Sequence, residues 1–97
     1  MGGGIREFPH EERFGLTAHL LRSATSIPSN IAEGCGRHSD TELARFLTIA
    51  AGSASETEYQ LLLAHDLGYL EPHDHEQLST KVNEVKRMLT TFIQKLG

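Results

Sequence analysis

The sequence predicts an all-α protein, an antiparallel up-down bundle in which three helices are present. Apolar residues recur at steps of three and four in three long segments, which is typical of amphipathic helices. Connections of about four to six residues make consecutive helices antiparallel neighbours. The expected helices span residues 9–35, 40–67 and 73–96. They form one bundle domain over residues 9–97, after a flexible Gly-rich segment at residues 1–8.

The first helix is expected to begin at Pro9, since proline suits a first helical turn and Glu11 and Glu12 suit the positive end of the helix dipole. Proline inside a helix removes a backbone hydrogen bond, so Pro28 should bend or end it. The apolar pattern continues as far as Ile31, which favours a kink. The predicted core stripe consists of Phe14, Ala18, Leu21, Ala24, Ile27 and Ile31.

The second helix has a capping-box start at residues 39–42, with Ser39 as the N-cap and Glu42 reaching back to it. Gly52 lies in its interior, where glycine costs about 1 kcal/mol against alanine, so we expect a packing reason for it. The predicted apolar stripe consists of Leu43, Phe46, Leu47, Ala50, Ala54, Thr57, Leu61 and Ala64.

The third helix is expected to be capped by Asp74 with Gln77. A heptad pattern follows at Leu78, Val82, Val85, Leu89, Phe92 and Leu96. Further apolar residues lie beside the main stripes and widen the apolar faces: Leu16, Leu20, Leu62, Leu63, Met88 and Ile93. Such wide faces call for a fourth helix or a partner subunit, and we therefore expect a homo-oligomer.

The composition disfavours several classes of protein. With 13 acidic and 9 basic residues the formal net charge is -4, which disfavours a dedicated nucleic-acid binder. Cys35 is the single cysteine, so no internal disulfide forms, as suits a cytoplasmic protein. No apolar run reaches the ~18 residues of a membrane helix, and we expect no membrane partner.

Two clusters resemble chemical sites. Cys35, His38 and Asp40 lie in one short loop, whereas a nucleophile and its base usually come from separate rigid elements. His73 and His75 do not have a zinc-ligand spacing, and residues two apart on a helix point to different faces. We interpret both clusters as surface features, and expect no enzyme activity, no cofactor and no bound metal.

Polar residues surround Pro28 in an otherwise apolar helix. Short polar side chains satisfy the backbone groups that a kink frees, so we expect this set to stabilise the kink and to tie it to a neighbouring helix. The alternative is a ligand pocket, since pockets favour the spaces between bundle helices. The expected residues are Ser26, Pro28, Ser29, Asn30, Glu33 and Gly34.

Basic residues near the first turn between helices are the candidates for a nucleic-acid or acidic-partner contact: Arg22, Arg37 and Arg45, with His38 nearby. The alternative interpretation is a solvated face that makes salt bridges between subunits.

Four segments resemble a known family. Residues 8–17 are similar to its FPxEExFGLT segment, and SIPSNIAEG at residues 26–34 is similar to its most specific signature. Residues 45–50 and 66–69 resemble later blocks. The family is the four-helix-bundle proteins related to the 23S rRNA intervening-sequence protein, which also includes the accessory variability determinants of diversity-generating retroelements. The resemblance covers residues 8–97.

The resemblance implies a bacterial, cytoplasmic, non-enzymatic bundle that forms a ring-shaped homo-oligomer, a pentamer. Family members carry a long helix before the Phe-Pro segment, and only residues 1–7 precede it here. The first family helix is thus expected to be largely absent, by truncation or because a partner replaces it. We expect an oligomeric helical scaffold; the alternative is an RNA- or DNA-binding accessory protein that acts with an enzyme such as a reverse transcriptase.

Overall fold

The computed structural model describes residues 10–97, which form three helices and no strand. Helix α2 spans His10–Cys35, α3 spans Asp40–Asp66 and α4 spans Pro72–Leu96. The all-helical class expected from the sequence is confirmed. Helix α3 ends, and α4 begins, one residue earlier than the pattern indicated. The expected flexible segment 1–8 lies outside the described residues.

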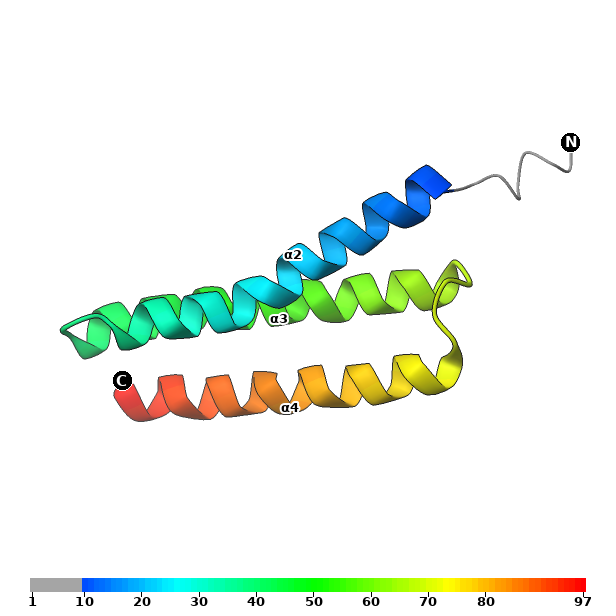
Figure 1. Ribbon diagram of the computed structural model, residues 1–97. Coiled ribbons are helices and arrows are strands. Elements are labelled where there is room, and N and C mark those ends of the chain that lie inside the picture. Colours follow the sequence, from blue (N-terminus) through cyan, green and yellow to red (C-terminus); the bar gives the residue numbers. More distant parts are fainter. Residues whose placement is uncertain (1–9) are drawn as a thin grey trace, which may run out of the picture.

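The three helices lie side by side with α3 in the middle. Figure 1 shows α2 and α4 running in one direction and α3 running in the other. Within residues 10–97, the backbone of α3 lies close to both neighbours, whereas the backbones of α2 and α4 do not approach each other. Side chains of α2 and Leu78 of α4 nevertheless line one cavity. A closed up-down bundle therefore stays a prediction.

The core is small and lies on α3. Leu47 and Ala50 of α3 and Leu89 of α4 form its buried centre. Partly buried side chains from all three helices pack against this centre: Ile27, Ile31, Leu43, Ala51, Val85, Ile93 and Leu96. Alanine is frequent on the buried side of α3, so the neighbouring helices approach closely but bury little apolar area per residue.

Helix α2 faces α3 with a different side from the one expected. Phe14 is 76% exposed and Leu21 is 58% exposed, so the predicted stripe was wrong in this half of the helix. Leu16 and Leu20 instead line a cavity of about 210 Å³ against Leu61 of α3. The reason is that the stripe takes three successive steps of three residues, and each such step falls about 60° short of a full turn.

Pro28 lies inside α2, which remains a single helix from His10 to Cys35. Figure 1 shows the ribbon of α2 changing direction in its middle, so that its first half leads away from α3. Proline lacks the N–H that the helix ladder requires at this point, which makes a bend the expected response. The exposed first half of α2 follows from this change of direction.

The helix ends agree only in part with the sequence signals. Ser39 Oγ accepts a hydrogen bond from the backbone N–H of Glu42 at 3.1 Å, as an N-cap does. The Glu42 carboxylate, however, pairs with Arg45. The cap expected at Asp74 was wrong: Asp74 lies in the first turn of α4, and the N-cap residue is Glu71.

Gly52 has no packing reason within the described chain. A Cβ atom built at Gly52 would meet nothing within 4 Å, so the expected close neighbour is missing from α2, α3 and α4. The surface of α3 at Gly52 therefore carries no side chain and faces no neighbouring helix within the described residues.

Candidate functional site

A polar seam joins α2 to α3, and consists of Ser23, Ser26, Asn30, Ser53 and Thr57. Ser26 Oγ and Ser53 Oγ lie 2.8 Å apart, and Asn30 Nδ2 donates to Ser26 Oγ at 2.9 Å. Thr57 Oγ1 donates to Ser23 Oγ at 3.0 Å between two buried side chains. Because each hydroxyl has its partner across the interface, the seam fixes how α2 and α3 slide against each other.

The residues that were expected to act together around Pro28 fall into two groups, one in the polar seam and one exposed to solvent. Ser26 and Asn30 take part in the polar seam. Pro28, Ser29 and Glu33 are exposed, and Glu33 accepts a hydrogen bond from Arg37 Nη2 at 2.6 Å. Half of the polar set thus faces solvent, and it does not line one pocket.

Gly34 marks the closest approach of α2 to α3. It is buried, and a Cβ atom built there would lie 2.9 Å from Phe46 Cβ and 3.1 Å from Leu43 Cδ1. Contacts below 3.0 Å require something to shift. Only glycine therefore fits between the end of α2 and the start of α3.

An arginine cluster lies at the turn between α2 and α3. The Arg37 and Arg45 guanidinium carbons lie 4.9 Å and 4.5 Å from the centre of the Phe46 ring, within cation–π range. Each arginine also pairs with a glutamate on its own side of the turn. Arg22 does not join this cluster, since 15 residues of helix separate it from Arg37 by about 22 Å along the axis.

The interface between α3 and α4 carries its own polar contacts. Lys86 Nζ donates to Glu58 Oε1 at 2.7 Å, and this hydrogen bond lowers the pKa of the Glu58 carboxyl. The rings of His65 and His75 stack with their centres 4.7 Å apart. These contacts hold two helices together. Among residues 10–97, no group of three potential ligands is placed to hold a metal ion.

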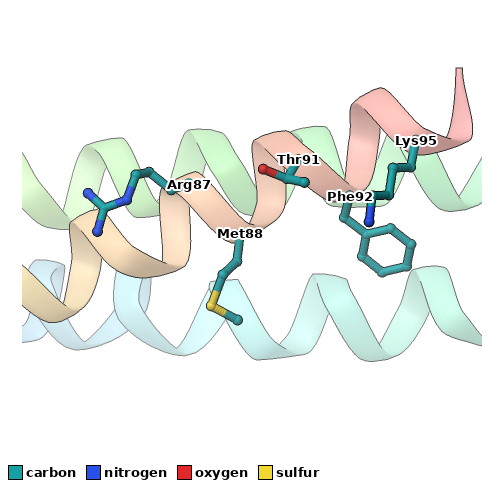
Figure 2. A pocket seen from close by; sticks show the side chains of 5 residues that line it. All are labelled: Arg87, Met88, Thr91, Phe92 and Lys95. Atoms are coloured by element: carbon teal, nitrogen blue, oxygen red, sulfur yellow. The ribbon is translucent and has the colours of Figure 1, made fainter.

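A groove lies along one side of α4. It has a volume of about 630 Å³ and is lined by Arg87, Met88, Thr91, Phe92 and Lys95. Figure 2 shows Met88 and Phe92 projecting from the same side of the helix. The lining combines two apolar side chains with two cations, which suits an amphipathic partner that carries an acidic group.

The family model of the 23S rRNA-intervening sequence protein matches residues 4–91. The chain belongs to this family. The resemblance found in the signature at residues 26–34 is thereby confirmed. The signature of the 23S rRNA-intervening sequence family supplies one side of the polar seam together with the close approach at Gly34.

A solved structure supports the same assignment. It is the crystal structure of a protein of unknown function from the S23 ribosomal protein family of Bacteroides thetaiotaomicron VPI-5482. It shares 32% sequence identity with the chain and has a TM-score of 0.79, covering 80% of this chain and 72% of that one. A comparison with curated proteins gave no match. Neither the family description nor that of the solved relative names an enzymatic activity.

Of the two clusters that resembled chemical sites, the first is exposed and the second is exposed only in part. Cys35 is exposed at the end of α2, and His38 and Asp40 are exposed beyond it. His73 is exposed, while His75 turns toward His65. No helix in the described part of the chain is long and apolar enough to cross a membrane.

Three members of the polar seam were not predicted from the sequence. Ser23 and Ser53 were not selected, and Thr57 was placed among the apolar positions. A signal was available, because a serine or threonine on the core-facing side of a helix needs a hydrogen-bond partner. Ser53 and Thr57 lie on α3, far in sequence from the Pro28 kink around which the polar set was predicted.

Proposed function

We propose that the protein is a non-enzymatic scaffold that assembles from several copies of itself in the cytoplasm of a bacterium, as a ring of five. The observation that carries this proposal is the number of large apolar side chains left in solvent on all three helices. They are Phe14, Leu21, Ile49, Tyr59, Leu62, Leu67, Leu78, Met88 and Phe92. Burial of these side chains between copies would remove their apolar surface from water, which favours association.

Light scattering coupled to size exclusion tests the assembly. We expect a mass that is a multiple of 10.7 kDa at micromolar protein, since a stable interface buries about 800 Å² on each partner. Circular dichroism at the same concentrations checks that the helices are intact. A folded species of 10.7 kDa at every concentration up to the millimolar range would contradict the proposal.

A second candidate function is RNA or DNA binding as an accessory to a nucleic-acid enzyme such as a reverse transcriptase. The observation in its favour is the arginine cluster, in which two exposed guanidinium groups converge on the exposed turn beside Phe46. Arginine pairs with phosphate oxygens in a bidentate geometry, and two arginines at one turn present several donors together. The net charge of -4 confines such a contact to a local patch.

Filter binding across a salt series tests this second function. If the cluster contacts phosphates, we expect Arg37→Ala with Arg45→Ala to weaken binding and to flatten the plot of log K against log salt by about 2, because each phosphate contact contributes about 0.9 to the slope. Arg22→Ala is the matched control and should change the slope less. Absence of binding at low salt, or binding that does not depend on salt, would exclude this function.

A further inference from the structure

The outer face of α2 carries a short amphipathic pattern that no other helix covers. Phe14, Ala18 and Leu21 follow each other at steps of four and three, so they lie on one side of the helix. Glu11 and Arg22 stand at the two ends of this row and are exposed. Eleven residues separate these two charges, which corresponds to three helical turns or about 16 Å.

The side of α4 that bears the groove carries a similar row, in which two apolar residues lie between an acidic and a basic residue. Met88 is 68% exposed and Phe92 is 42% exposed, and both project into the groove. Figure 2 shows these two side chains on the same side of α4, with Lys95 on the following turn. Glu84 lies one turn before Met88 and is exposed. Glu84 and Lys95 are again eleven residues apart, with the acidic residue first.

Two helices with this charge order complement each other when they run antiparallel. Such an arrangement places Glu11 opposite Lys95 and Arg22 opposite Glu84 at the same time, because both separations are three turns. Within the described chain none of these four side chains makes an ion pair. Both ends of each row are thus available for a partner.

The same register also matches the apolar residues in size. It sets Phe14 against Phe92 and Ala18 against Met88. A small residue opposite a long, flexible one lets two helices approach without a clash, and methionine fills irregular gaps well. Two pairs of charged residues and two pairs of apolar residues are therefore complementary in the same register.

We propose that the outer face of α2 in one copy of the chain binds antiparallel along the α4 groove of a second copy, in the register that pairs Phe14 with Phe92. A single chain does not form this contact, since its own α2 and α4 run in the same direction and their backbones do not approach each other. The inference rests on the proposed assembly and specifies its contact. Because the two surfaces differ, the contact is heterologous, and repeating it closes a ring or extends a filament.

Mixing two variants tests the heterologous contact. Phe14→Asp destroys the outer face of α2 and leaves the groove intact, whereas Met88→Asp does the reverse. We expect each variant alone to be a folded monomer, and an equimolar mixture to form a dimer and nothing larger, because only one intact pair of surfaces remains. Ser55→Asp, at an exposed position on α3 that is not among the apolar side chains proposed to lie between copies, is the control and should leave the wild-type assembly unchanged.

The outcomes separate the two proposals. A wild-type protein that is itself monomeric would overturn the assembly and the contact together. A wild-type assembly that survives both Phe14→Asp and Met88→Asp would overturn the contact alone. Self-association of either variant by itself would also overturn it, since that result requires a surface that pairs with its own copy.

Cross-linking measures the register independently of affinity. In a Cys35→Ser background, chains carrying Ala18→Cys are mixed with chains carrying Met88→Cys and oxidised. Opposed residues on packed helices meet the Cβ spacing of a disulfide, so a covalent dimer of twice the chain mass is expected. Ala18→Cys mixed with Thr90→Cys, which does not line the groove, is the control and should give no covalent dimer. Cross-linking through position 90 and not through position 88 would overturn the register.

Discussion

Leu47→Ala is expected to lower the free energy of unfolding by about 3 kcal/mol. Leu47 is the largest fully buried side chain of the core, and its neighbours come from all three helices. Truncating a buried leucine loses its transfer free energy and leaves a cavity, at a cost of about 2–5 kcal/mol. A domain of this size has about 5–15 kcal/mol in total, so the loss is a large share of its stability.

Urea unfolding followed by circular dichroism measures this loss at a fixed protein concentration, because assembly makes apparent stability depend on concentration. Glu56→Ala provides the control, since Glu56 lies on the same helix, is exposed and is not among the apolar side chains proposed to lie between copies. We expect the control to lose less than half as much. Equal losses at the two positions would mean that Leu47 does not occupy the core.

Gly34→Ala is expected to destabilise the protein by about 1–3 kcal/mol, as overpacking a close contact does. The added methyl group would lie 2.9 Å from Phe46 Cβ, which sits next to the backbone and has little freedom to move. The end of α2 would then have to move away from α3. Alanine is otherwise the better helix former, so the expected loss opposes the intrinsic preference.

Gly52→Ala is the matched control and should have the opposite sign. Nothing lies within 4 Å of a Cβ atom at Gly52, so the substitution gains up to about 1 kcal/mol of helix propensity without a clash. Thermal unfolding of the two variants at one concentration compares them directly. A higher melting temperature for Gly34→Ala would contradict the close approach of α2 to α3.

The positions of the helices could be predicted from the sequence, but the side of each helix that is buried could be predicted only in part. In α4 the heptad pattern is regular, and Leu89 lies in the core as the spacing indicates. Leu78 and Phe92 of the same predicted row are instead 41% and 42% exposed. In α2 the apolar residues surround more of the helix, so spacing alone did not distinguish Leu16 and Leu20 from Phe14 and Leu21. The choice depends on where α3 lies, which is a long-range property.

In the candidate site, too, residues close together in sequence were predictable, whereas their partners on another helix were not. A serine at position 26 and an asparagine at position 30 are evident as a polar pair around a proline, and the structure places both of them in the polar seam. The partner of Ser26 across the interface, Ser53, lies 27 residues away on another helix, and no local pattern connects the two. Likewise, Arg37 and Arg45 meet only because the turn folds back on Phe46.

The central place of α3 has a consequence for how the chain reaches its native state. Within residues 10–97, the close backbone contacts between helices join neighbours along the sequence, α2 with α3 and α3 with α4, and none joins α2 with α4. Loop closure is therefore short at each step, and chains with such low contact order fold within about microseconds to milliseconds. Either hairpin can form first, with α3 as the template on which the remaining helix docks.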